Sequence, residues 1–91
     1  MADSDKPWQI ILAPRAIKDL QRVPLAMRQR LLDAMDGLGA YPRRGDFRKL
    51  QGFEDEWRLR VGEWRIRFTF DEERREVHIL RVLPRGRAYR D

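Results

Sequence analysis

The sequence predicts a small α+β domain in which a strand and two helices precede a three-stranded antiparallel meander. Apolar and polar residues alternate from Trp57 to Phe70 on both sides of Gly62-Glu63, which is typical of two strands joined by a tight turn. Two earlier segments begin at proline and space their apolar residues as helices do. Because two helices can cover only one face of the sheet, the other face should be open.

The first elements follow from the order of apolar residues. Residues 1–7 are polar and are expected to be disordered. Residues 8–12 form a short apolar run that predicts the first strand. A helix is expected from Pro14, because the first helical position needs no N–H group. The side chains of this helix expected to face inward are Ile17, Leu20 and Val23.

A second helix is predicted to begin at Pro24 and to end at Gly37 and Gly39. The apolar residues expected to face inward are Leu25, Leu31, Leu32, Met35 and Leu38. Since almost no linker separates the two helices, they should form an αα-hairpin. Residues 40–56 contain a proline and two glycines and are predicted to be a loop.

The three-stranded meander begins with a β-hairpin whose loop is Gly62-Glu63, and glycine in the first loop position suits a type II′ turn. In the simplest register the pairs are Val61 with Trp64, Arg60 with Arg65, Leu59 with Ile66, and Arg58 with Arg67. The apolar residues then share the face that covers the core. A third strand is expected over residues 77–83, whose apolar residues on both faces are typical of a central strand.

Four arginines share the opposite face of this hairpin, namely Arg58, Arg60, Arg65 and Arg67. Like charges directly opposite one another destabilise a sheet, so the presence of four arginines on one face needs an explanation. One interpretation is a binding surface for a polyanion, because arginine holds phosphate with a planar, bidentate fork. The other is a solvated face that carboxylates from elsewhere in the chain neutralise.

Composition narrows the class of protein. At 91 residues the chain predicts a single domain, residues 1–91. It has no cysteine, so disulfides and thiolate metal sites are excluded, and its net charge of +5 favours nucleic acid or an acidic protein as partner. No apolar run is long enough to cross a bilayer and no signal-peptide pattern is seen, so a cytoplasmic protein without a membrane partner is expected.

The residue types also exclude several kinds of catalysis. The chain has no glycine-rich phosphate loop, and its single histidine, His78, excludes a poly-His metal site. We therefore expect no metal and no cofactor. Cleavage of RNA fits what remains, because its 2′-hydroxyl is an internal nucleophile and arginines can stabilise the charged transition state. An aromatic residue such as Tyr89 can stack on an unpaired base.

A series of motifs carries a resemblance that covers nearly the whole chain from Trp8. The motifs are Lys49-Leu50-Gln51-Gly52, Trp57–Val61, Gly62–Phe68, Ile79–Val82, Pro84-Arg85 and Tyr89-Arg90. In this order they resemble toxins of the RelE/ParE superfamily, and within it the RelE-type mRNA interferases. The resemblance implies a RelE-like fold, a toxin of a type II toxin–antitoxin system, and ribosome-dependent cleavage of mRNA. It implies the ribosome, mRNA and a cognate antitoxin as partners, and we expect the antitoxin to carry an acidic segment.

The resemblance also implies roles for single residues. Arg65 would stabilise the scissile phosphate, Arg85 would hold this phosphate or assist the leaving 5′-oxygen, and Tyr89 would stack on the substrate base. Arg58 and Arg60 are also placed in the catalytic site, although the best-known members have lysines there. Because arginine keeps its proton, neither can act as the general base, which is left open. Further contacts with RNA phosphates are expected from Arg67, Lys49, Arg87 and Arg90.

Two other functions fit the sequence. A ParE-like toxin that inhibits DNA gyrase without nuclease activity shares the fold and the antitoxin partner, but Arg85 and Tyr89 favour the nuclease. A non-catalytic, basic nucleic-acid-binding module is the third interpretation. It fits less well because the hairpin aromatics share the core face, whereas stacking platforms expose their rings.

Overall fold

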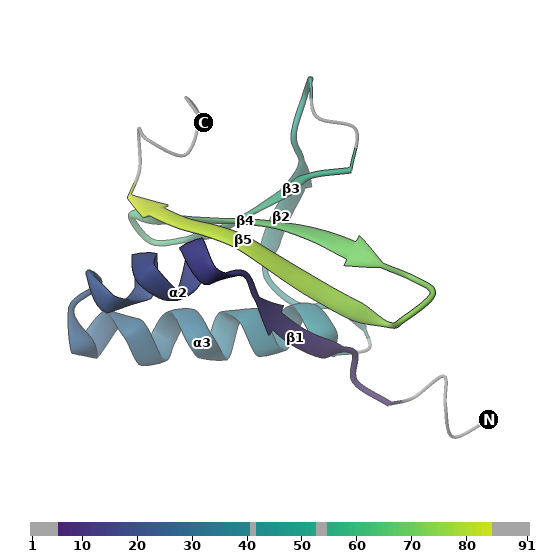
Figure 1. Cartoon of the computed structure of the whole chain (residues 1–91), viewed down its shortest axis with the longest axis horizontal. Coiled ribbons are helices and arrows are strands. Elements are labelled where there is room, and N and C mark those ends of the chain that lie inside the picture. Colours follow the sequence, from purple (N-terminus) through teal and green to yellow (C-terminus); the bar gives the residue numbers. More distant parts are fainter. Residues whose placement is uncertain (1–5, 41, 53–54, 85–91) are drawn as a thin grey trace.

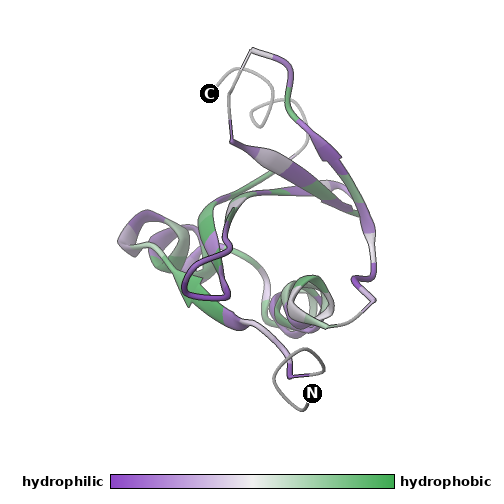
Figure 2. Ribbon diagram, turned by 90° about the vertical axis from the view of Figure 1, so that its right-hand side faces the viewer, coloured by the Kyte–Doolittle hydropathy of each residue, from purple (hydrophilic) through white to green (hydrophobic). Residues whose placement is uncertain are grey.

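The computed structural model describes residues 6–40, 42–52 and 55–84. Its elements are β1 (Gln9–Leu12), α2 (Pro14–Gln21), α3 (Leu25–Gly39), β2 (Asp46–Lys49), β3 (Trp57–Val61), β4 (Trp64–Asp71) and β5 (Glu76–Pro84). The predicted α+β class is confirmed, and both helices lie on one side of the sheet (Figure 1). In the view of Figure 2 the sheet arches over the long helix α3.

The five strands form one sheet in the order β1-β5-β4-β3-β2. β1 runs parallel to β5, and the other neighbours are antiparallel. The predicted register of the β3–β4 hairpin is confirmed, from Val61 opposite Trp64 to Arg58 opposite Arg67. Gly62 has a φ of 57°, a left-handed value that glycine adopts without steric cost.

The prediction that residues 40–56 form only a loop is wrong, because Asp46–Lys49 form the edge strand β2 beside β3. The strand has four residues, too few for alternation to stand out from a charged loop. This strand forms because its backbone pairs with β3, and such pairing cannot be predicted from its own four residues. The consequence is that Arg48 lies directly opposite Arg58.

The core lies between the helices and the covered face of the sheet. Its helical side chains are Ala16, Leu20, Val23, Leu31, Met35 and Leu38, and its strand side chains include Leu59, Ile66, Phe68, Val77, Ile79 and Val82. Two residues predicted to face inward do not, since Ile17 is 46% exposed and Leu25 is 76% exposed. Ile17 stands one residue off the buried stripe of α2, and Leu25 is the first residue of α3.

The segment just before β1 is held against the end of α3. The backbone N–H of Trp8 donates to the carbonyl of Gly39 at 2.8 Å. A Cβ atom on Gly39 would lie 2.5 Å from the carbonyl oxygen of Trp8. This close approach requires glycine at the last position of α3. The predicted disorder of residues 1–5 lies outside the described residues.

In the described part of the chain, no helix has the length and the apolar character needed to cross a membrane.

Candidate functional site

The strand registers place four arginines side by side across the sheet, one from each of β2, β3, β4 and β5. These residues, which we call the arginine row, are Arg48, Arg58, Arg67 and Arg81. Paired residues of neighbouring strands share a face, so the row lies on the face opposite the core. Arg60 and Arg65 form the next pair on the same face. The structure therefore brings together the four hairpin arginines that the sequence predicted to share a face.

Arg67 has a carboxylate partner that the hairpin itself does not contain. Its guanidinium Nη2 donates to Oε2 of Glu56 at 2.6 Å, and Arg67 is only 5% exposed. Such a short, charge-assisted bond is strong. Arg67 thus has a carboxylate partner from elsewhere in the chain, as the second interpretation of this face expected, but it is buried rather than solvated.

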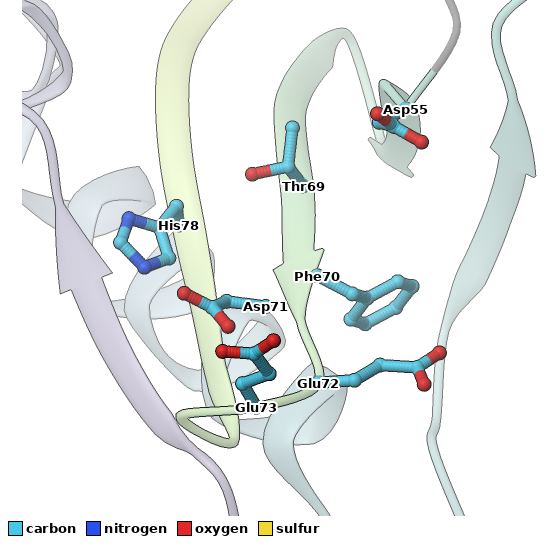
Figure 3. Close-up of a pocket in the computed structure, with 7 residues that line it drawn as sticks. All are labelled: Asp55, Thr69, Phe70, Asp71, Glu72, Glu73 and His78. Atoms are coloured by element: carbon cyan, nitrogen blue, oxygen red, sulfur yellow. The ribbon is translucent and has the colours of Figure 1, made fainter.

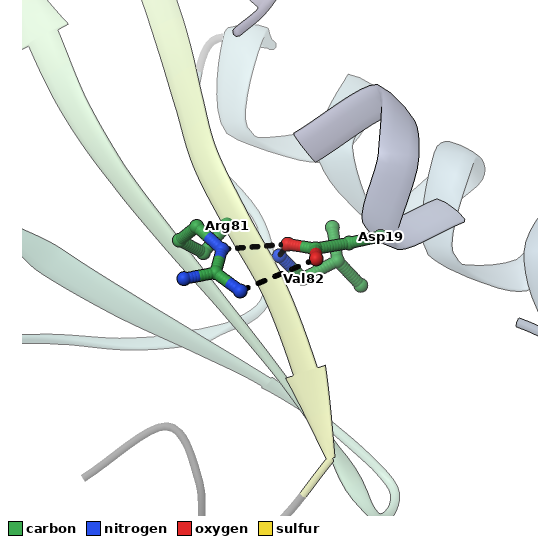
Figure 4. A network of polar contacts seen from close by, with 3 residues as sticks. All are labelled: Asp19, Arg81 and Val82. Atoms are coloured by element: carbon green, nitrogen blue, oxygen red, sulfur yellow. Dashed lines mark hydrogen bonds and ion pairs between the residues drawn. The ribbon is translucent and has the colours of Figure 1, made fainter. Parts of the chain in front are cut away.

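Arg81 is held by a carboxylate from a helix. Its Nε and Nη2 atoms donate to the two oxygens of Asp19 at 2.9 and 3.3 Å, and the backbone N–H of Val82 donates to Oδ2 of Asp19 at 2.8 Å (Figure 4). The pairing of β1 with β5 ends at Ile79. Beyond that point the carboxylate of Asp19, in place of a strand, accepts a backbone hydrogen bond from β5. The same contacts fix the direction of the Arg81 guanidinium.

Arg65 does not project from the face as the sequence suggested. It is 2% exposed, and its Nη1 donates to the carbonyl oxygens of Gly62 and Trp64, both at 3.0 Å. The guanidinium therefore caps the turn of the hairpin to which it belongs. Arg60 is exposed and Arg58 is half-buried, so these two hairpin arginines are the ones that a ligand can reach.

Lys49 is not part of this surface. It is paired with Trp57, and Trp57 packs against the core cluster. Lys49 therefore lies on the face opposite the arginine row, at the end of the edge strand. Four further predicted site residues, Arg85, Arg87, Tyr89 and Arg90, lie outside the described residues.

A cavity of about 170 Å³ lies beside the row, where α2 meets the end of β5. Its lining includes Asp19, Arg22, Arg81 and the half-buried ring of Trp64. Pro84 also lines it, and the chain continues from there into the segment that carries the remaining predicted site residues. A ring and charged groups around a small cavity suit a flat, polar ligand such as a nucleobase.

Sequence reasoning missed Arg48 and Arg81. Arg48 falls in the segment predicted to be a loop, and its place in the row depends on the pairing of β2 with β3. The register between β4 and β5 shifts between Arg67 and Phe68, so simple counting along β5 does not bring Arg81 opposite Arg67.

Comparison with known families gives a match over most of the chain. The model of the ParE toxin of type II toxin–antitoxin systems, parDE, matches residues 10–89. A search of curated protein sequences gives no significant match.

Solved structures with the same fold include toxins bound to antitoxins. A chain of the toxin–antitoxin complex RelBE2 from Mycobacterium tuberculosis is 27% identical, with a TM-score of 0.77 over 90% of this chain and 98% of that chain. A chain of the archaeal RelE–RelB complex from Pyrococcus horikoshii is 29% identical, with a TM-score of 0.74 over 90% and 99%. The isolated E. coli RelE toxin is 18% identical, with a TM-score of 0.73 over 87% and 85%, and supports the fold alone.

Proposed function

Because this chain belongs to the ParE toxin family of type II toxin–antitoxin systems, within the RelE/ParE superfamily, we propose that it is an endoribonuclease that cleaves mRNA on the ribosome. The observation that carries the proposal is the arginine row together with Arg60. Neighbouring strands are about 4.8 Å apart, so a row across four strands spans about 14 Å. Its exposed or half-buried members, Arg48 and Arg58, lie beside Arg60 and can contact the phosphates of a single RNA strand.

The proposed reaction is attack of a 2′-oxygen on the adjacent phosphorus, with loss of the 5′-oxygen of the next nucleotide. The new bond closes a 2′,3′-cyclic phosphate, and the broken P–O bond leaves a 5′-hydroxyl that takes up a proton. Negative charge accumulates on the phosphate oxygens in the transition state, and preorganised cations stabilise it. Arginine supplies this charge without a metal ion.

The proposed roles differ among the arginines because their surroundings differ. Arg60 and Arg58 contact the phosphate, since they are the hairpin arginines that are exposed or half-exposed. Arg65 acts by its charge rather than by direct contact, because its Nη1 is bonded to two carbonyl oxygens. Arg81, aimed by Asp19, borders the cavity that would receive a base.

The segment after Pro84 completes the proposed site. Arg85 holds the scissile phosphate or assists the leaving 5′-oxygen, and Tyr89 stacks on the substrate base. Arg87 and Arg90 add phosphate contacts. This assignment rests on the resemblance to RelE-type toxins and on the position of Pro84 beside Arg81 and the cavity.

The proposed partners are the ribosome, mRNA and a cognate antitoxin. Relatives with 27% and 29% identity were crystallised as complexes of a toxin with its antitoxin, which supports a similar partner here. With a net charge of +5 and a basic sheet face, the chain should attract an acidic antitoxin segment. Charge complementarity of this kind speeds capture. Dependence on ribosomes places the protein in the cytoplasm.

The test is cleavage of a defined mRNA in a purified translation system. Wild-type protein, Arg60→Ala, Arg85→Ala and the matched control Arg15→Ala are compared, with naked RNA in EDTA as a further control. Arg15 is an exposed arginine of α2, so its removal changes net charge without touching the arginine face. We expect discrete cuts only with ribosomes, a loss of about 100-fold or more in rate for Arg60→Ala and Arg85→Ala, and no loss for Arg15→Ala.

Uncut mRNA at protein concentrations that stop growth would overturn the proposal. Cleavage at wild-type rates by both Arg60→Ala and Arg85→Ala would leave a nuclease but move its site away from the arginine face. Cutting of naked RNA at the same positions would mean that cleavage does not depend on the ribosome.

A second candidate function is inhibition of DNA gyrase without nuclease activity. The match to the ParE toxin model over residues 10–89 favours it. The burial of Arg65 and Arg67 favours it as well, because it leaves fewer arginines within reach of RNA. Gyrase supercoiling of a relaxed plasmid distinguishes the two functions: inhibition together with intact mRNA supports the gyrase function, and unaffected supercoiling together with cut mRNA supports the nuclease.

A further inference from the structure

The far end of the β4–β5 hairpin carries three potential metal ligands on the face opposite the core. Asp71 of β4 lies directly opposite Glu76 of β5, and His78 follows Glu76 by two residues, which returns it to the same face. One ligand atom from each of the three residues lies within 4.8 Å of the other two. Figure 3 shows His78 and Asp71 approaching one another from neighbouring strands.

Contacts within the hairpin hold these three residues in place. Oδ1 of Asp71 accepts a hydrogen bond from the backbone N–H of Arg74 at 3.1 Å, and Nε2 of His78 lies 2.9 Å from Oε1 of Glu76. The side chain of His78 is 35% exposed and that of Glu76 is 19% exposed. The donor atoms are therefore partly ordered by the protein but open to a small ion.

A shallow hollow of about 490 Å³ gives access to this end of the sheet, and Asp71 and His78 line it. Three further carboxylates border it, those of Asp55, Glu72 and Glu73. Two like charges placed directly across an antiparallel pair destabilise it, and here a cross-strand pair of carboxylates stands among other acids. A bound cation would remove this repulsion, and the imidazole beside the pair provides a nitrogen ligand.

We propose that Asp71, Glu76 and His78 bind a divalent transition-metal ion, with Zn²⁺ as the ion that best fits the donor set. One imidazole nitrogen and two carboxylate oxygens are ordinary zinc ligands, and three protein ligands leave a fourth position for water. Mg²⁺ and Ca²⁺ fit less well because both prefer oxygen ligands alone. The sequence excluded a site made of several histidines, but not one in which a single histidine joins two acids.

The ion would clamp β4 to β5 across the turn that joins them. This turn contains Arg75, a non-glycine residue with a φ of 54°, a conformation uncommon for side chains other than glycine. Asp71 is four residues along β4 from Arg67, a distance of about 13 Å in an extended strand. The metal would therefore stabilise the hairpin without touching the RNA phosphate, and the inference does not depend on the proposed nuclease.

The test uses the only histidine of the chain as its own probe. The full chain, free of affinity histidines and cleared of metal with EDTA followed by dialysis, is titrated with ZnCl₂. The ring proton signals of His78 are followed by NMR, which needs no further assignment because the sequence has one histidine. We expect the signals to shift or broaden and to saturate at one equivalent, with a rise in melting temperature of about 5 °C or more at tenfold excess over the dissociation constant.

Variants separate this site from adventitious zinc. Asp71→Asn and Glu76→Gln should fold without metal at the wild-type melting temperature or above it, because each removes one of the two opposed charges. Both should lose the thermal response to zinc. The control Glu72→Gln changes another acid of the same hollow and should keep the wild-type response.

Three results would overturn the proposal. The first is a His78 ring signal that does not change at millimolar zinc. The second is a zinc response that survives in Asp71→Asn and Glu76→Gln. The third is loss of the response in Glu72→Gln to the same extent, which would reduce the site to attraction of zinc by a general negative charge.

Discussion

At the scale of single residues, Asp19 shows how a carboxylate far away in sequence can order one side of a surface. It accepts hydrogen bonds from Arg81 and from the backbone of Val82. Its side chain is 12% exposed and that of Arg81 is 20% exposed. Because both are largely removed from water, loss of the carboxylate leaves a guanidinium and a backbone donor without their partner.

Asp19→Ala should therefore lower the free energy of unfolding by about 2–4 kcal/mol. Asp19→Asn should cost less, because the amide oxygen can still accept from Val82 N–H. Urea unfolding followed by circular dichroism measures both values. Asp36→Ala, which removes an exposed acid of α3, is the control and should stay within about 0.5 kcal/mol of wild type. Equal effects of the Asp19 and Asp36 variants would contradict the structural role given to Asp19.

The face of each hairpin residue could be predicted from the sequence, but its surroundings could not. Alternation alone assigns Arg58, Arg60, Arg65 and Arg67 to one face, since the period of a strand is two. The burial of Arg65 depends on carbonyl groups of the turn, and that of Arg67 on Glu56. Such contacts depend on how side chains fold back in three dimensions, which the period does not describe.

At the scale of elements, the end of α3 and the segment before β1 pack so closely that a side chain at Gly39 has no room. A Cβ atom on Gly39 would meet the Trp8 carbonyl oxygen at 2.5 Å, a backbone atom that cannot turn away. A Cβ atom on Gly37, in the same helix, would meet Cβ of Arg44 at 3.4 Å, an ordinary contact. The two glycines therefore form a matched pair.

Gly39→Ala should destabilise the protein by about 1–3 kcal/mol through overpacking. Gly37→Ala should be neutral or stabilising by up to about 1 kcal/mol, because alanine is the better helix former. Thermal unfolding of both variants gives the comparison. If Gly39→Ala melts at or above the temperature of Gly37→Ala, the close approach to Trp8 is not a constraint in solution.

The elements that the sequence predicts well are those with long patterns. The eight residues of β4 and the nine of β5 give many alternations or a long apolar run. The four residues of β2 are too few to give such a pattern. The helical pattern of α2 and α3 also predicted that Ile17 and Leu25 face inward, and both are exposed. Ile17 lies one position off the buried stripe of α2, and one position turns a side chain by about 100°, which is enough to expose it, whereas Leu25 is the first residue of α3.

At the scale of the whole molecule, charge is divided along the open face of the sheet. The arginine row crosses its middle, whereas Asp71 and Glu76 pair at the far end of the β4–β5 hairpin. Within the row, Arg67 and Arg81 are bonded to Glu56 and Asp19, so the exposed positive charge of this face comes from Arg48 and from the neighbouring Arg60. This uneven distribution should orient the protein as it approaches a polyanion.

Binding to ribosomes should accordingly weaken as salt rises, because each phosphate contact releases counterions. Arg60→Ala should lower the slope of log affinity against log salt concentration by about one unit. Arg15→Ala, which removes an equal charge from α2, should leave the slope unchanged. Sedimentation with purified ribosomes between low and high KCl measures it. Equal slopes for all three proteins would mean that the arginine face is not the docking surface.

The sequence predicts the class of the whole molecule but not the order of its sheet. Helical and strand periods are local, so they predict the series of elements along the chain and the apolar face of each element. They do not predict which strands are neighbours. The parallel pairing of β1 with β5 and the addition of β2 at the opposite edge join segments that are distant in the chain. The arginine row depends on this order, because its members come from four strands.

The pairing of β1 with β5 also has a consequence for synthesis. The strand that emerges first from the translating ribosome can find its neighbour only after the last described strand, Glu76–Pro84, has emerged. Contacts between distant segments form late, so the sheet cannot be complete before β5 has folded against β4 and β1. The arginine row includes Arg81 of β5, so a nascent chain lacks the complete row until this strand has joined the sheet.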